Sequence, residues 1–276
     1  MSARTIDTGT DHLLASVEDR VATITLNRPE RRNAFSSEML SGLALALDDA
    51  ERASDVGCVV ITGAGGAFCA GGDVKGMNER NAGGGEGPGI DARIHAQRLS
   101  QRATSGRIYT MPKPVIAALP GAAAGAGFAV ALACDLRVAA DNAVLVTSFA
   151  RVGFSGDYGG TFFLTQLVGA SKARELYYLS DRVTADEALR LGLVNRVVPA
   201  SELAKATREL ALRLAQGPTV AYRYMKENIN RAASGADVMD CLDLEATHHV
   251  HTGLTEDHRE AAKAFVEKRE PSFKGR

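Results

Sequence analysis

Two glycine-rich segments are the part of this sequence best suited to do chemistry with their backbone. Residues 63–75 (GAGGAFCAGGDVK) and residues 121–130 (GAAAGAGFAV) each follow an apolar run typical of a buried strand. Small residues at the end of such a strand leave backbone N–H groups free near the start of a helix. Free N–H groups can stabilise negative charge that develops on an oxygen, as in an oxyanion hole. Close backbone packing requires the same residue types, so the pattern alone leaves both interpretations open.

Three other candidate motifs fail on spacing. No GxGxxG follows a strand, which leaves a dinucleotide site unsupported. Residues 153–160 (GFSGDYGG) place Asp157 where a GxSxG nucleophile elbow needs its last glycine, which disfavours a serine hydrolase. His248, His249 and His251 do not share one helix face, and no carboxylate completes an HExxH pattern. We interpret the histidines as a solvated or interface cluster rather than as metal ligands.

Composition and charge exclude several functional classes. The 276 residues, 45% of them apolar, suffice for one sizeable core with an appended smaller domain. A net charge of −1 provides no global field for attracting nucleic acid. No apolar stretch approaches the roughly 20 residues that cross a bilayer, and the N-terminal segment lacks the apolar core of a secretory signal. We therefore expect no nucleic-acid or membrane partner and a cytoplasmic protein. The four cysteines form no CxxC pair and are expected to be small buried residues.

The elements that must position the glycine segments alternate between strands and helices. Ser36 or Ser37 can cap a helix whose Leu40, Leu43 and Leu47 share one face. The order strand, glycine turn, helix then occurs twice. The periodicity predicts a hairpin over 12–27, strands over 57–63, 113–121 and 135–147, and helices over 92–110 and 122–135.

The second half of the chain is mostly helical. A helical pattern begins at Gly160, one strand is predicted over 193–199, and Pro199 marks a boundary. Residues 200–270 predict about three helices, whose apolar faces need the core or another subunit as a partner. Residues 81–91 combine glycine, proline and charge without an apolar period and predict a mobile loop.

Six segments together resemble the crotonase (enoyl-CoA hydratase/isomerase) family over nearly the whole chain. They are residues 26–35, 61–75, 113–143, 152–169, 173–198 and 264–273. The resemblance implies an α/β fold with a crotonase-like spiral of ββα units over residues 1–199. It assigns residues 200–276 to a helical region that serves oligomerisation and closes the ligand site. It also implies an acyl-CoA substrate, a homotrimer or dimer of trimers, and no metal or redox cofactor.

The resemblance further assigns roles to individual residues. The backbone N–H groups of Gly72 and Ala126 match the two donors that hold the thioester oxygen as it becomes an enolate. The matched positions that surround CoA are Arg32, Ala70, Asp73 and Lys75, and those that close the site, often from a neighbouring subunit, are Phe265 and Lys268. Without the resemblance, each lone Arg or Lys would be interpreted as a solvated charge. The segment 81–91 matches the wall of the acyl pocket.

The chain departs from the family pattern at the two glutamates that position and protonate water in hydratases. Ala129 and Phe149 occupy these positions, and neither side chain can transfer a proton. Asp157 matches a carboxylate found in family isomerases, including ring-epoxide isomerases of phenylacetyl-CoA breakdown. One carboxylate suffices to take a proton from one carbon and return it to another. Burial beside Phe149 and Phe154 is expected to raise the pKa of Asp157.

We therefore predict an acyl-CoA isomerase of fatty-acid or aromatic-acid breakdown, with Asp157 as the acid and base. Hydration of a 2-enoyl-CoA, carried out by a lyase, is the first alternative. A non-catalytic acyl-CoA binder and a thioester hydrolase that uses Asp157 are the others. An Asx turn in a glycine-rich loop is the structural alternative for Asp157.

Overall fold

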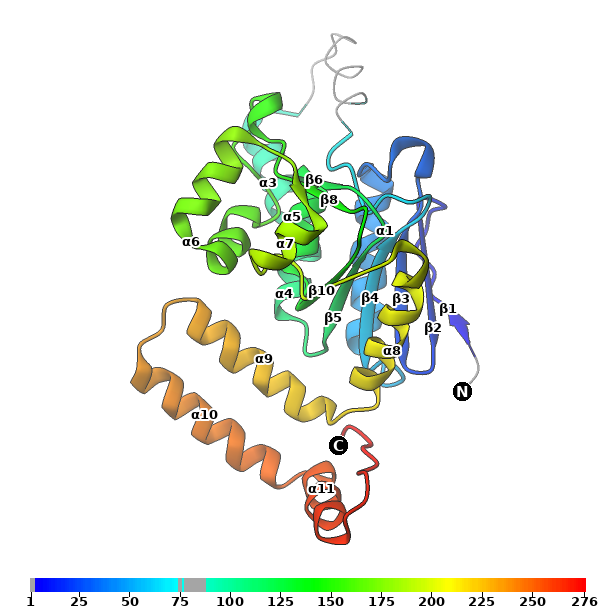
Figure 1. Cartoon of the computed structure of the whole chain (residues 1–276), viewed down its shortest axis with the longest axis vertical. Helices are drawn as coiled ribbons and strands as arrows, with labels where there is room; N and C mark the ends of the chain where they lie inside the picture. Colours follow the sequence, from blue (N-terminus) through cyan, green and yellow to red (C-terminus); the bar gives the residue numbers. More distant parts are fainter. Residues whose placement is uncertain (1–2, 74–75, 77–87) are drawn as a thin grey trace.

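The computed structural model describes residues 3–73, 76 and 88–276 as a mixed α/β protein (Figure 1). A seven-stranded sheet has the order β1-β2-β3-β4-β5-β7-β10, and a three-stranded sheet has the order β6-β8-β9. The first two pairings of the large sheet are antiparallel and the other four are parallel. The strands are β1 (Arg4–Thr5), β2 (Leu13–Glu18), β3 (Val21–Leu26), β4 (Cys58–Gly63), β5 (Val115–Leu119), β6 (Ala123–Ala124), β7 (Leu136–Ala140), β8 (Val144–Val146), β9 (Val183–Thr184) and β10 (Arg196–Val198).

The predicted hairpin is formed by β2 and β3. Buried and exposed residues alternate along β2, as expected for a strand with one solvated face. Glu18 pairs with Val21, so Asp19 and Arg20 form a two-residue turn in which both have positive φ (49° and 66°). Such turns match the right-handed twist of the flanking strands.

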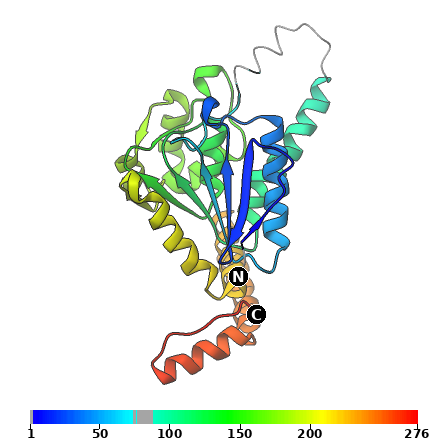
Figure 2. The same cartoon turned by 90° about the vertical axis from the view of Figure 1, so that its right-hand side faces the viewer.

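The central strands are buried on both faces because helices cover both sides of the large sheet. Val59 and Ile61 of β4 pack in one apolar cluster, which includes helix α1 (Ser37–Arg52). Cys58 and Val60 pack in a second cluster with helix α8 (Leu203–Ala215). Figure 2 shows α1 and α8 on opposite sides of the sheet. This arrangement explains why the β4 sequence is continuously apolar rather than alternating.

Residues 135–147 were predicted as one strand, and this prediction is wrong. They form β7 and β8, which belong to different sheets. The chain reverses between them in a turn that Ala143 closes by donating its N–H to the carbonyl of Ala140, 2.9 Å away. Both strands are rich in apolar residues, so periodicity alone does not reveal the turn, which is marked by Asp141 and Asn142.

The remaining helices surround this framework. Helix α6 is interrupted at Gly169, whose φ of 74° and ψ of 162° are not helical. Four α-helices follow Pro199, rather than the three expected, and α3 begins two residues earlier than expected. The α-helices beyond α1 and α8 are α3 (Ile90–Gln101), α4 (Arg107–Thr110), α5 (Gly125–Ala133), α6 (Gly160–Leu179), α7 (Ala185–Arg190), α9 (Thr219–Ala233), α10 (Val238–Gly253) and α11 (Glu256–Glu267).

The last three helices project from the core (Figures 1 and 2). Helices α9 and α10 pack against each other as an antiparallel pair. Asp237 caps α10 by accepting hydrogen bonds from the N–H groups of Met239 and Asp240, and Thr255 caps α11. Large apolar side chains on these helices remain exposed in the single chain, among them Ile229, Leu242 and Phe265.

Other sequence expectations can be checked within the described residues. Cys58, Cys69 and Cys134 are buried as expected, whereas Cys241 is only half-buried. In the part of the chain that the structure describes, no helix combines the length and the apolar character needed to cross a bilayer. No cluster of three or more potential metal-ligating side chains occurs among the same residues.

Candidate active site

The two glycine segments lie side by side. Phe68 donates its N–H to the carbonyl of Ala122 at 3.0 Å, and Ala124 donates to the carbonyl of Cys69 at 2.8 Å. A Cβ atom at Gly127 would lie only 2.5 Å from the Cβ of Cys69, so this approach requires glycine. The small residues therefore serve close packing, and the packing brings both candidate oxyanion donors to one place.

The two candidate oxyanion donors, Gly72 and Ala126, lie near the start of helix α5. Ala126 is the second residue of α5, so its N–H has no partner within the helix. Gly71 has a φ of +90°, and a Cβ atom there would lie 3.3 Å from the nitrogen of Ala126. The positive end of the α5 dipole adds to the field at this point.

A cavity of about 420 Å³ opens at these two residues. Four predicted site residues line it together: Gly72, Asp73, Ala126 and Asp157. The other lining residues are His12, Arg28, Phe35, Ser36, Ser37, Glu38, Leu40, Gln97 and Tyr158. The structure thus brings the predicted donors and the predicted acid/base group to one cavity.

Three carboxylates line this cavity, and their environments differ. Asp73 accepts a hydrogen bond from the N–H of Gly76 at 3.0 Å and pairs with Arg28 at 3.3 Å, and both contacts lower its pKa. The exposed Glu38 lies in the first turn of α1, where hydrogen bonding from its own backbone and then from Ser36 lowers its pKa. Only Asp157 has a raised pKa, about 6, because burial disfavours its charged form. It is therefore the cavity carboxylate best matched to proton transfer near neutral pH.

Asp157 also stands out by its lack of partners. Its Oδ1 atom is buried, and no hydrogen bond to it is found within the described residues. Phe149 is buried as expected, but the expectation for Phe154 is wrong, because this side chain is 57% exposed. The glycine-rich loop before α6 turns Phe154 to the outside, so it contributes little to the desolvation of Asp157.

Tyr158 is fixed by helix α3, which sequence reasoning did not connect with the site. Its N–H donates to Gln101 Oε1 at 2.7 Å, and its hydroxyl lies 3.2 Å from Ser100 Oγ. These contacts hold Tyr158 in a left-handed backbone conformation, with a φ of 48°. Polarity on the predicted helix 92–110 is a weak signal, because exposed helix faces carry the same residue types.

Among the described residues that are predicted to surround CoA, Asp73 lines the cavity, whereas Arg32 and Ala70 are not among its lining residues. The carbonyl of Arg32 accepts a hydrogen bond from the N–H of the exposed Ala70 at 2.9 Å, so these two are neighbours. Asp73 is held by Arg28, which sequence reasoning missed. Lys75 and residues 81–87 of the predicted loop lie outside the described residues.

Within one chain, the structure does not bring Phe265 and Lys268 to the cavity. Phe265 is 85% exposed on α11, and Lys268 ends this helix with a φ of 54°. Figure 1 places α11 at the opposite end of the molecule from α3, which borders the cavity.

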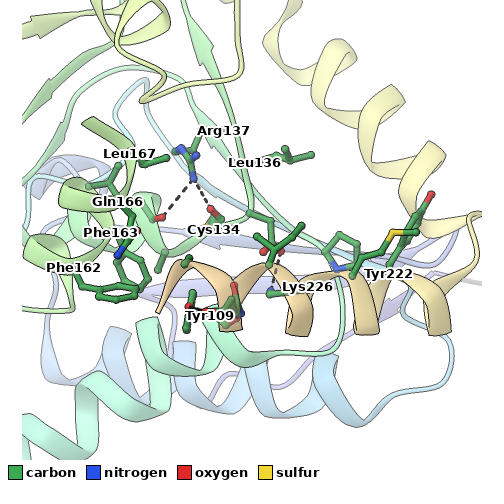
Figure 3. Close-up of a pocket in the computed structure, with 18 of the residues that line it drawn as sticks. Tyr109, Cys134, Leu136, Arg137, Phe162, Phe163, Gln166, Leu167, Tyr222 and Lys226 are labelled. Atoms are coloured by element: carbon green, nitrogen blue, oxygen red, sulfur yellow. Dashed lines mark hydrogen bonds and ion pairs between the residues drawn. The ribbon is translucent and has the colours of Figure 1, made fainter. Parts of the chain in front are cut away.

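A second cavity, of about 360 Å³, lies between α9 and the core (Figure 3). Aromatic and aliphatic side chains dominate its walls, including Phe162, Phe163 and Met225. Its charged groups are all engaged. Lys226 Nζ lies 2.9 Å from Asp135 Oδ2 and 2.8 Å from the carbonyl of Ile108, and Arg137 donates to backbone carbonyls. These contacts attach α9 to the core, and they leave no charged side chain of this α9 cavity free to act as an acid or base.

The predicted histidine cluster belongs to the α9–α10 pair. His248 is buried, with its Nδ1 atom 2.6 Å from Asn228 Oδ1 and its ring 4.3 Å from that of Tyr224. These contacts agree with an interface role between two helices.

The sequence profile of the family described as enoyl-CoA hydratase/isomerase matches residues 16–276. A 1,2-epoxyphenylacetyl-CoA isomerase of Escherichia coli (strain K12) is 38% identical over 267 residues, which cover 96% of this chain and 99% of the relative. A short-chain-enoyl-CoA hydratase of Clostridium acetobutylicum is 36% identical over 268 residues, with 96% and 99% coverage.

Solved structures show the same likeness. An enoyl-CoA hydratase from Polaromonas sp. JS666 superposes with a TM-score of 0.87 at 35% identity, covering 95% of this chain and 99% of that one. A protein from Mycobacterium abscessus described as a putative enoyl-CoA hydratase/isomerase gives a TM-score of 0.89 at 33% identity, with 96% and 100% coverage. The predicted α/β fold class, a crotonase-like spiral with a helical C-terminal region, is confirmed.

Proposed function

Since this chain belongs to the enoyl-CoA hydratase/isomerase family of acyl-CoA enzymes, we propose that it isomerises an acyl-CoA by moving one proton with Asp157. The observation that carries the proposal is the contrast among the cavity carboxylates. Among the described carboxylates of the cavity, Asp157 alone has a raised pKa and a buried oxygen for which the described residues supply no partner. It shares the cavity with Gly72 and Ala126. The similarity to the E. coli isomerase supports the same assignment.

The proposed reaction balances with one carboxylate. The Asp157 carboxylate removes the proton from C2 of a 3-enoyl-CoA, and the electron pair of that C–H bond moves onto the thioester oxygen. Gly72 and Ala126 donate hydrogen bonds to the resulting enolate oxygen. The protonated Asp157 then returns the proton to C4, which leaves the double bond between C2 and C3. No metal or redox cofactor takes part in this scheme.

The energetic contributions follow from general principles. One oxyanion donor contributes about 2.7–4 kcal/mol in other enzymes. A positioned acid/base group contributes roughly 10²–10⁴-fold in rate, and its pKa works best near the operating pH. The pKa of Asp157, about 6, meets that condition.

The remaining assignments complete the proposal. Arg32, Ala70, Asp73 and Lys75 bind CoA, as the family resemblance implies. Phe265 and Lys268 close the site of a neighbouring subunit in a homotrimer or dimer of trimers, since α11 leaves them exposed in one chain. The apolar side chains exposed on α9–α11 support an assembled form. The proposed location is the cytoplasm.

Hydration of a 2-enoyl-CoA is the second candidate, favoured by the similarity to the Clostridium hydratase. Buried Ala129 and buried Phe149 offer no group that could activate water, so Asp157 would have to act alone. A non-catalytic acyl-CoA binder would retain the oxyanion donors but would need no carboxylate of raised pKa. Release of free CoA would identify thioester hydrolysis.

The test uses panels of trans-3-enoyl-CoA and trans-2-enoyl-CoA in deuterated buffer, followed by mass spectrometry and proton NMR. The wild type is compared with Asp157→Asn and with Asp181→Asn, an exposed aspartate that serves as the matched control. We expect isomer interconversion and deuterium at C2 and C4, lost only in Asp157→Asn. A gain of one water by the wild type, whether or not it survives in this variant, would replace the proposal with a hydratase, and ligand binding without any turnover would favour the binder.

A further inference from the structure

Tyr177 lies directly behind the loop that carries Asp157. The interruption at Gly169 folds the second half of α6 back toward its first turn, so Tyr177 returns to the start of its own helix. A Cβ atom at Gly160 would lie 2.6 Å from Tyr177 Oη, and one at Gly156 would lie 3.4 Å from it. The phenol hydroxyl therefore sits against the two glycines that bracket Asp157 in the sequence.

The ring of Tyr177 is fixed by packing. It stacks on Phe149 with a centroid distance of 5.7 Å and an interplanar angle of 9°. The same Cβ atom at Gly160 would lie 3.0 Å from the Cβ of Ala129. Phe149 and Ala129 are the two positions at which hydratases are expected to carry glutamates, and here an aromatic stack and a methyl group fill the space around the tyrosine.

The negative charge of Asp157 contributes to raising the pKa of three other groups, Cys69, Tyr158 and Tyr177. The first two already have hydrogen-bond partners. Cys69 Sγ lies 3.0 Å from the carbonyl of Asn33, and Tyr158 Oη lies 3.2 Å from Ser100 Oγ. Burial first, and then the Asp157 charge, raise the pKa of Tyr177. Within the described residues, no hydrogen-bond partner is found for its hydroxyl.

The hydroxyl of Tyr177 in α6 and the carboxylate of Asp157 in the preceding loop are a donor and an acceptor that complement each other. A tyrosine hydroxyl donates, an ionised carboxylate only accepts, and an unsatisfied buried polar atom is costly. We propose that Tyr177 is a positioning residue for Asp157: its hydroxyl donates to one carboxylate oxygen through one bridging water and so aims the other oxygen at the substrate carbon. This inference rests on the proposed function of Asp157.

The test compares Tyr177→Phe with Tyr178→Phe, since Tyr178 is the next residue on the same helix and is 72% exposed. Tyr177→Phe keeps the stack on Phe149 and removes only the hydroxyl. A hydrogen bond to a charged group supports a loss of about tenfold to hundredfold in kcat, with KM nearly unchanged. Loss of the donor disfavours the carboxylate, so the acid limb of the kcat profile should move to higher pH. Tyr178→Phe should change neither quantity.

Two results would overturn the inference. One is a Tyr177→Phe enzyme with the kcat and the acid limb of the wild type. The other is a loss of kcat with an unmoved acid limb and a lowered melting temperature, which would show that Tyr177 only packs.

A second readout does not depend on turnover. Carbon-13 NMR of the Asp157 carboxyl follows its titration in both proteins, with Asp157→Asn used for assignment. A higher midpoint in Tyr177→Phe supports the inference even if no acyl-CoA is isomerised, in which case only the proposed function fails. Equal midpoints overturn the inference whatever the substrate.

Discussion

The two cavities bury acidic groups in opposite ways. In the α9 cavity, Asp135 accepts from Lys226 at 2.9 Å and from the N–H of Val115 at 2.7 Å. In the cavity at Gly72 and Ala126, Asp157 keeps a buried oxygen without a partner in the described chain. A buried carboxylate with a complete set of partners holds elements together, whereas one without them is available for chemistry. Apolar character alone would have directed attention to the α9 cavity, although it is the smaller of the two.

The largest expected effect separates these roles directly. Asp157→Asn should lower the isomerisation rate by roughly 10²–10⁴-fold, since an amide cannot carry the proton. Its free energy of unfolding at pH 7 should stay equal or rise, because a partly desolvated charge is removed. Isomerisation assays measure the rate, and urea unfolding measures the free energy of unfolding. A large loss of stability would show that Asp157 is structural, like Asp135.

Lys226→Met tests the α9 cavity. It leaves the Asp135 carboxylate buried beside an apolar side chain, which should cost about 3 kcal/mol of stability. Activity per folded molecule should change little. Lys263→Met, which removes an exposed pair with Glu267 at 3.9 Å, is the matched control and should cost less than about 1 kcal/mol. Equal losses in both variants would contradict the distinction.

The raised pKa of Asp157 should also make the stability of the protein depend on pH. Burial raises the pKa of Asp157 to about 6 in the folded protein, above its ordinary value. The folded state therefore binds the proton more tightly than the unfolded state does, and this contribution to stability is lost as the pH rises through about 6. Relative to Asp157→Asn, the wild type should lose about 2 kcal/mol between pH 4 and pH 7. Denaturant unfolding at both pH values measures this difference, and a constant gap would contradict the raised pKa.

The smallest effect is expected at Ser36, a hydrogen-bonded residue that lines the cavity at Gly72 and Ala126. Ser36 Oγ accepts from the N–H of Met39 at 3.1 Å and lies 2.8 Å from His12 Nδ1. Ser36→Ala should cost about 1 kcal/mol, as for other helix caps. The NMR titration of Asp157 should not move. A shifted midpoint would show that the cap and the acid are coupled.

The parts of the fold that the sequence predicts are those governed by local pattern. The alternation in β2, the continuous apolar run of β4 and the Ser36 cap of α1 are each encoded within a few residues. The turn between β7 and β8 carries a local signal too, the Asp141–Asn142 pair, but the apolar runs on both sides favoured an unbroken strand.

The same limit applies to the site. Glycine segments and the aspartate are visible in the sequence, and the resemblance gave them roles. Three other features of the site depend on tertiary contacts. They are the ion pair of Asp73 with Arg28, the hydrogen bond from Tyr158 to Gln101, and the packing of Tyr177 against Gly160. No periodicity carries that information, because each contact joins different elements or the two halves of a broken helix.

The interruption at Gly169 has a kinetic consequence. It divides residues 160–179 into two short helices that fold back on each other. Gly72 and Ala126, by contrast, follow strands β4 and β5, so we expect them to come together only after these two strands have paired. Short loops close at lower entropic cost, and contacts near in sequence tend to form sooner. During refolding, we expect Tyr177 to pack against the Asp157 loop before Gly72 and Ala126 come together. Recovery of activity should therefore lag behind burial of this tyrosine.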